Sequence, residues 1–109
     1  GIEDQIHGGV VQGIGWALYE SMAHDGDGRL QTGSLMDYTV PSAIKAPPME
    51  AIMVEVPAPT GPLGARGVGE PPIMAGAGAV AAAIADATGA RFTELPMTPE
   101  RVVAALRQR

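Results

Sequence analysis

The chain has 109 residues and a mass of 11.1 kDa, which is enough for one domain and too little for a cofactor domain beside a substrate domain. Its net charge of −5 and pI near 4.8, without a basic run, argue against nucleic-acid and anionic-membrane partners. The absence of cysteine excludes a disulfide framework, thiolate metal ligation and a cysteine nucleophile.

Residues 5–22 are predicted to form a helix with one core-facing side. Large apolar residues recur there every four positions, at Ile6, Val10, Ile14, Leu18 and Met22. Glycines interrupt this pattern, and each costs about 0.5–1 kcal/mol relative to alanine inside a helix, so they need a packing reason. Gly9, Gly13 and Ala17 share one face and would form a ridge that another backbone or a flat ligand can approach closely. Gln5 stands at the head of this ridge.

The next part of the chain is predicted to contain a turn and strands. Residues 24–28 combine Asp and Gly in the way that a tight reversal requires. A calcium loop starting at Asp25 would need Glu where Met36 stands, so that alternative is rejected. Residues 29–40 and 51–56 carry the β-compatible side chains of strands.

Residues 57–72 hold five Pro and four Gly, and a compact loop of this kind is usually functional. Near its end, Pro71 is expected to keep Glu70 extended at the N-terminus of the following helix. The positive end of the helix dipole favours the ionised carboxylate that a general base needs. A helix-capping or surface carboxylate is the alternative interpretation of Glu70.

Two further helices are predicted. Residues 73–88 form an alanine-rich helix that ends at Gly89 and is apolar nearly all round. Burying it requires more apolar surface than this chain owns, so we expect cover from another segment or chain. Its apolar run is shorter than the roughly 20 residues of a membrane-spanning helix. Thr98 as N-cap and Pro99 at the first helical position predict a short amphipathic helix.

Other catalytic patterns fit poorly. His7 has no second histidine at helical spacing, and a lone histidine is more often an ordinary hydrogen-bonded residue than a metal ligand. Residues 13–18 contain two glycines of a dinucleotide fingerprint, but Leu18 replaces the third. Residues 64–69 are glycine-rich without the Lys-Ser or Lys-Thr of a P-loop.

Two strings resemble one known family. Residues 64–72, Gly-Ala-Arg-Gly-Val-Gly-Glu-Pro-Pro, resemble the C-terminal catalytic loop of the molybdenum-binding subunit of the xanthine dehydrogenase and aldehyde oxidase family, whose Gly-Glu carries the active-site base. Residues 5–15 resemble that family's glycine-rich helix, whose leading Gln contacts the pterin of the molybdenum cofactor. The order and separation of the strings also fit, as do residues 32–34, 37–38 and 95–101, so the resemblance covers nearly the whole chain.

The resemblance implies part of a molybdenum-dependent hydroxylase or dehydrogenase that oxidises an aldehyde or an N-heterocycle with water-derived oxygen. Glu70 would be the general base, and Gly69 would position its carboxylate. Gln5 would hold the pterin, and the ridge containing Gly9 would let the cofactor approach closely. No residue of this chain is expected to ligate a metal directly.

The resemblance also implies the surroundings of the chain. We expect an α+β piece, the C-terminal portion of a molybdenum-hydroxylase large-subunit domain, in which residues 1–109 form a single partial domain with about three helices and two to four strands. Its expected partners are the remainder of the molybdenum subunit, iron–sulfur and flavin (FAD) subunits, and a small-molecule substrate. The pterin is expected in its cytosine dinucleotide form and the protein in the cytoplasm.

The first residue is Gly1 and not Met, which indicates a fragment of something longer. The resemblance implies that most cofactor contacts lie in upstream segments that are absent here, so we expect the chain to be inactive alone. The alternative is a non-catalytic interaction or remnant module that docks on a partner subunit. Both interpretations expect an obligate partner, and they differ in the role of Glu70.

Overall fold

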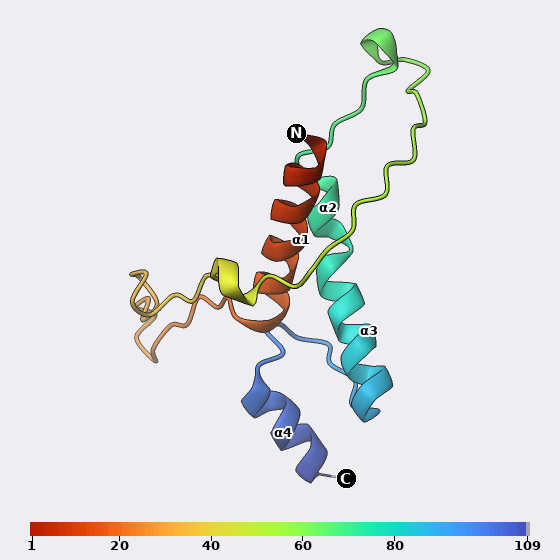
Figure 1. Cartoon of the computed structure of the whole chain (residues 1–109). Coiled ribbons are helices and arrows are strands. Elements are labelled where there is room, and N and C mark those ends of the chain that lie inside the picture. The colour runs from red at the N-terminus through yellow and green to blue at the C-terminus, as the bar shows by residue number, and fades with distance from the viewer. Residues whose placement is uncertain (109) are drawn as a thin grey trace.

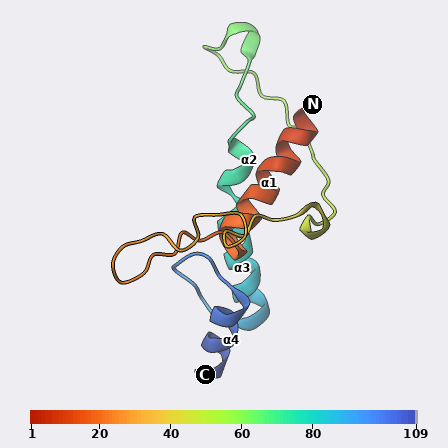
Figure 2. The ribbon, with the colours of Figure 1, turned by 90° about the vertical axis from the view of Figure 1, so that its left-hand side faces the viewer.

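The computed structural model describes residues 1–108. Its helices are α1 (Ile2–Leu18), α2 (Pro71–Met74), α3 (Gly76–Thr88) and α4 (Pro99–Arg107), with short 3-10 turns at Ala43–Lys45 and Pro62–Gly64. Helix α1 lies beside α2 and α3, and the long connection between them leaves the helices and returns (Figures 1 and 2). The expected helices are therefore present, joined by loops that extend well away from them.

Helix α1 begins before Gln5 and ends at Leu18, four residues short of the predicted end at Met22. The backbone N–H groups of Tyr19 and Glu20 both donate to the carbonyl of Gly15, at 2.9 and 2.8 Å. These two hydrogen bonds to one carbonyl oxygen close the helix. The Tyr38 hydroxyl then donates to the Glu20 carboxylate at 2.5 Å and ties the following loop to the end of α1.

The Tyr38–Glu20 contact predicts a pH dependence. The hydrogen bond to Glu20, partial desolvation and the negative charge of Glu20 raise the pKa of Tyr38 above its ordinary value of 10.0. The stabilisation by this proton is therefore fully present below pH 10.0 and is lost as the pH rises through the raised pKa. In a tyrosinate absorbance titration, wild type minus Tyr38→Phe should give a midpoint above 10.0, and Glu20→Gln should lower it. A midpoint at or below 10.0 in the wild type would contradict this assignment.

The predicted alanine-rich helix is divided at Ala75 into α2 and α3. Both Glu70 and Ala75 keep right-handed helical backbone angles, so the break is a slight change in winding between two helical pieces. Gly89 ends α3 in the left-handed conformation, with φ of 70°, as predicted for a C-terminal glycine. The segment therefore runs in nearly continuous helix from Glu70 to Gly89.

The predicted strands are not confirmed. Within residues 1–108 the structure contains no strand, and the one isolated β-bridge pairs His24 with Leu30. In the segment 51–56, Ile52 and Val54 are 78% and 81% exposed. A strand needs a neighbour to complete its backbone ladder, and the described part of the chain places none beside that segment. The expectation of two to four strands in an α+β piece is thus corrected, for the described residues, to helices with long loops.

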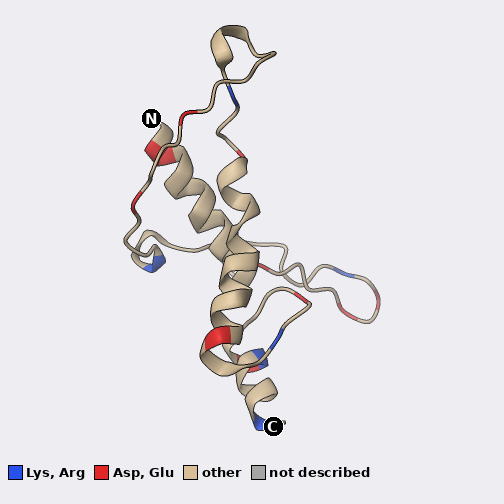
Figure 3. Cartoon of the chain, turned by 90° about the vertical axis from the view of Figure 1, so that its right-hand side faces the viewer, with Lys and Arg blue, Asp and Glu red and all other residues tan. Residues whose placement is uncertain are grey.

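The chain builds little core of its own. Its buried hydrophobic residues are Ala17, Ala90 and Met97, whereas many large apolar side chains are exposed. The radius of gyration is 17.2 Å, compared with about 13 Å for a compact domain of this length. The helices α1 and α3 also carry few charges (Figure 3). This surface fits the expectation that cover comes from outside the chain.

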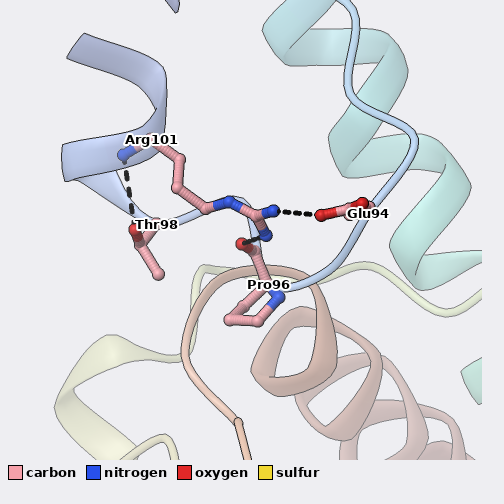
Figure 4. A network of polar contacts seen from close by, with 4 residues as sticks. All are labelled: Glu94, Pro96, Thr98 and Arg101. Atoms are coloured by element: carbon pink, nitrogen blue, oxygen red, sulfur yellow. Dashed lines mark hydrogen bonds and ion pairs between the residues drawn. The ribbon is translucent and has the colours of Figure 1, made fainter. Parts of the chain in front are cut away.

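Helix α4 is anchored at its start. The Thr98 hydroxyl accepts from the Arg101 N–H at 3.4 Å, which confirms the predicted N-cap. The Arg101 guanidinium donates to the Glu94 carboxylate at 2.6 Å and to the Pro96 carbonyl at 2.8 Å (Figure 4). Just before the helix, the Met97 N–H donates to the Ala17 carbonyl at 2.6 Å. This last bond attaches the segment before α4 to the C-terminal end of α1.

The backbone N–H of Glu100 and the Thr98 side chain lower the pKa of Glu100 from its ordinary value, since both favour the ionised carboxylate at the start of α4. Among the residues that the structure describes, no helix has both the length and the hydropathy needed to cross a membrane.

Candidate functional site

The predicted ridge of small residues on α1 is where α2 and α3 pack. A Cβ atom added to Gly9 would lie 2.6 Å from the Cβ of Pro72, and one added to Gly13 would lie 3.0 Å from the Cα of Gly76. Gly13 follows Gly9 by four residues on α1, and Gly76 follows Pro72 by four residues on the segment formed by α2 and α3. Helix α1 and this segment therefore run in the same direction. Glycine at these positions permits an approach that any side chain would prevent.

This packing corrects part of the sequence interpretation. The small residues were expected to admit either a backbone or a flat ligand, and the structure fills the Cβ side of Gly9 with Pro72. The backbone alternative therefore describes this face of α1. A direct contact between Gly9 and a cofactor stays a prediction.

Glu70 lies at the N-cap of α2, on the turn that leads into the helix crossing. It was expected to be extended because Pro71 follows it, but its φ of −99° and ψ of −28° are right-handed helical. The Ile73 N–H donates to the Glu70 carbonyl at 3.0 Å, and this first-turn bond explains the departure. The side chain is exposed and makes no capping hydrogen bond with the described part of the chain. Its carboxylate is thus free to act on another group.

Gln5 lies in the first turns of α1, and its side chain is exposed. Because α1 and α2 run in the same direction, Gln5 and Glu70 are at the same end of the helix pair (Figures 1 and 2). No hydrogen bond joins their side chains among the bonds of residues 1–108. The structure therefore brings the two predicted site residues to one end without pairing them.

Sequence reasoning missed the environment of His7. Its Nε2 atom is buried and has no hydrogen-bond partner among the described residues. A buried polar atom without a partner is costly, which makes it a candidate for contact with a group outside this chain. The only signal in the sequence was its place on α1 between Gln5 and Gly9.

The loop before Glu70 combines a fixed part with an open part. Arg66 donates to the carbonyls of Val56 at 2.5 Å and Pro57 at 3.4 Å, which holds together the two ends of the projecting turn. A Cβ atom added to Gly67 or Gly69 would meet nothing within 4 Å. The glycines next to the carboxylate therefore leave room for another molecule or segment.

A hollow of about 510 Å³ lies between the start of α1 and this loop. It is lined by Ile2, Ile6 and Val68, among others, and by neither Gln5 nor Glu70. Its apolar lining offers no acid or base pair for catalysis apart from the carboxylate of Glu55 and the guanidinium of Arg66. The candidate site is thus the exposed end of the helix pair and not this hollow.

The chemistry available at that end is limited but specific. A carboxylate on a helix N-terminus can accept a proton, and a primary amide can both donate and accept hydrogen bonds. Within residues 1–108 no cluster of three His, Cys, Asp or Glu side chains is arranged to hold a metal ion. The chain can therefore supply a base and polar contacts to a group that is held largely by other segments.

The sequence is similar to one known protein family and to several curated proteins. Residues 1–47 match the family profile of the molybdopterin cofactor-binding domain. The nicotine 6-hydroxylase large subunit of Paenarthrobacter nicotinovorans is 43% identical over 107 residues, covering 95% of this chain and 13% of that protein. The xanthine dehydrogenase molybdenum-binding subunit of Escherichia coli O157:H7 is 41% identical over 101 residues, covering 92% of this chain and 13% of that protein.

A solved structure gives the same result in three dimensions. The crystal structure of quinoline 2-oxidoreductase from Pseudomonas putida 86 superposes with a TM-score of 0.90 at 34% identity. The superposition covers 99% of this chain and 14% of that one. The chain thus spans 13% of the length of the two curated relatives described above. The loops, as well as the helices, keep in this chain the arrangement that they have in a much larger protein.

Proposed function

Since this chain belongs to the molybdenum-binding subunits of the xanthine dehydrogenase and aldehyde oxidase family, we propose that it supplies the general base and part of the pterin contacts of a molybdenum hydroxylase. The observation that supports this best is the placement of Glu70 and Gln5 at one end of a parallel helix pair. The relatives do not favour the alternative of a non-catalytic docking module.

The residues present fit a molybdopterin group. The Nε2 atom of His7 is buried and has no hydrogen-bond partner within residues 1–108, and the side chain of Gln5 is exposed on the same helix. Gln5 would hold the pterin through its amide, with Gly9 beside it on α1, and the open backbone around Gly69 would let the group approach Glu70. When bound, the cofactor supplies a two-electron redox centre for adding water-derived oxygen to a substrate carbon.

Glu70 would accept the proton that this oxygen atom loses when it attacks the substrate. Its place at the N-cap of α2 puts the residue at the positive end of the helix dipole. Gly69, with no atom near its Cβ position, leaves the carboxylate accessible from the loop side. The proposed substrate is an N-heterocycle or an aldehyde. The first of these classes is supported by nicotine 6-hydroxylase, xanthine dehydrogenase and quinoline 2-oxidoreductase, which are named for N-heterocycles.

The proposal includes the surroundings of the chain. The remainder of the molybdenum subunit would cover the exposed apolar side chains, and iron–sulfur and FAD subunits would carry electrons away. The pterin is proposed to be the cytosine dinucleotide form. These partners account for a chain that has a larger radius of gyration than a compact domain.

The testing experiment is purification under native conditions of the full protein that carries this chain. Its molybdenum, iron and flavin contents are measured, and its turnover of nicotine, quinoline, xanthine and benzaldehyde is assayed with an artificial electron acceptor. We expect about one molybdenum per copy and turnover of at least one probe. A folded, metal-free monomer without turnover would instead support the docking or remnant module.

Gln5→Ala is expected to lower pterin occupancy. Loss of one or two hydrogen bonds should weaken retention by about threefold to tenfold, measured as pterin released per purified subunit after dialysis. Gln12→Ala is the matched control, because Gln12 is an exposed glutamine on the same helix beyond the proposed site. Equal occupancy in the two variants would remove Gln5 from the site.

A further inference from the structure

We propose that Gly76, together with Gly13 opposite it, is a positioning residue that sets the place of the Glu70 carboxylate. This inference rests on the proposed role of Glu70 as the base. It assigns a function in the reaction to a helix contact that touches neither cofactor nor substrate.

The contact between the two glycines is between backbones. A Cβ atom added to Gly76 would lie 2.7 Å from the Cα and 3.0 Å from the carbonyl carbon of Gly13. Both atoms belong to the backbone of α1, which cannot rotate away as a flexible side chain could. An ordinary carbon contact begins near 3.4 Å, so even alanine would push the helices apart by about 0.7 Å.

A shift at Gly76 is transmitted to Glu70 through a stiff segment. Helical backbone runs from Glu70 through α2 and Ala75 into α3, and the bond from the Ile73 N–H to the Glu70 carbonyl closes the first turn. Pro71 and Pro72 fix two φ angles within that turn. Six residues of helix span only about 9 Å, so little of the shift can be absorbed on the way.

A second contact sets the direction of the movement. Pro72 lies against Gly9 in the same register in which Gly76 lies against Gly13. Separating the helices at Gly76 therefore tilts α2 about the contact at Pro72, and Glu70 lies two residues beyond that contact. Because this lever is half as long as the one from Pro72 to Gly76, a shift of about 0.7 Å at Gly76 moves the Glu70 end of α2 by about 0.35 Å in the opposite direction. A misplacement of about 1 Å can lower a catalytic rate about a hundredfold, so this smaller shift is expected to lower it severalfold.

The test compares Gly76→Ala with Gly78→Ala in the full assembled enzyme. Gly78 lies on the same helix, and a Cβ atom added there meets nothing within 4 Å in this chain. We expect Gly76→Ala to lower kcat per bound molybdenum about threefold to tenfold, with KM and molybdenum content near the wild-type values. Turnover is measured with whichever of nicotine, quinoline, xanthine and benzaldehyde reacts fastest.

A structural readout accompanies the kinetics. Crystal or cryo-EM structures of the variants should show the Glu70 carboxylate displaced in Gly76→Ala and unmoved in Gly78→Ala. This comparison decides the matter whether or not a probe is turned over. An undisplaced carboxylate, an unchanged kcat per molybdenum, or equal losses in the two variants would each overturn the proposal.

Gly13→Ala provides a second variant with a milder overlap, since its added Cβ would lie 3.0 Å from Gly76 Cα. If neither Gly76→Ala nor Gly13→Ala assembles, the contact is required for folding and the positioning role is wrong. Glu70→Gln is assayed in parallel. Retained turnover in Glu70→Gln contradicts the proposed function, whereas an inactive Glu70→Gln beside a fully active Gly76→Ala contradicts only the positioning role.

Discussion

Glu70→Gln should reduce turnover by about 10²- to 10⁴-fold in the assembled enzyme while leaving molybdenum content and subunit composition unchanged. Glutamine has nearly the same shape as glutamate, so the turn at the start of α2 can keep its backbone bond to Ile73. The amide cannot accept a proton as a carboxylate does. The measurement is kcat per bound molybdenum with the fastest of the four probe substrates.

Glu50→Gln is the matched control for this substitution. Glu50 is an exposed glutamate in the loop that leads to the segment 51–56, 20 residues before Glu70 in the sequence. The control removes the same charge without touching the proposed base, so its turnover should equal that of the wild type. Retained turnover in Glu70→Gln would leave Glu70 as a helix-capping or surface carboxylate, the alternative that the sequence left open.

The helix ends were predictable because they depend on local chemistry. Thr98 and Pro99 start α4, and Gly89 ends α3, through caps that involve residues within a few positions. The end of α1 was not predictable in this way. The loop that contains Tyr38 and Pro41 returns to this end of the helix. The Tyr38 hydroxyl donates to Glu20, and a Cβ atom on Gly15 would lie 2.9 Å from the Pro41 ring. Contacts between distant segments leave no local signal in the sequence.

The prediction of strands was wrong for a related reason. The alternation of Ile52, Val54 and Val56 describes side chains that suit a half-buried extended segment, and it does not supply a partner for the backbone. These side chains are exposed in this chain. The alternation predicts that the segment 51–56 can form a strand when another strand lies beside it, and the described residues of this chain provide no such strand.

The candidate site was predictable in its residues and not in its assembly. The glycines at 9 and 13 indicated a close approach, but the sequence could not show that the approaching group is the helix that follows Glu70. This contact joins the two family strings physically. The strings stand far apart in the sequence, and the parallel packing of α1 on α2 and α3 places the first residue of one and the carboxylate of the other at the same end.

Gly9→Leu should prevent assembly of the enzyme, because a leucine side chain would have to enter space already filled by Pro72. A Cβ atom alone would lie 2.6 Å from the Pro72 Cβ, and the proline ring cannot rotate away. Overpacking of this kind costs about 3 kcal/mol. The expected result is a loss of soluble assembled subunit in native gels and a lower melting temperature in whatever remains.

Gly8→Leu is the matched control, since Gly8 is the neighbouring residue on α1 and has nothing within 4 Å of its Cβ position. The pair also separates two roles for Gly9. If Gly9 served only to admit the pterin, Gly9→Leu would assemble with normal stability and lack pterin. If its main role is the crossing with α2, assembly itself fails, and restoring space with Pro72→Gly should recover part of the assembly of the milder variant Gly9→Ala. Recovery in that double variant, without any change in the pterin site, would identify the contact with Pro72 as the reason that α1 carries glycine at this position.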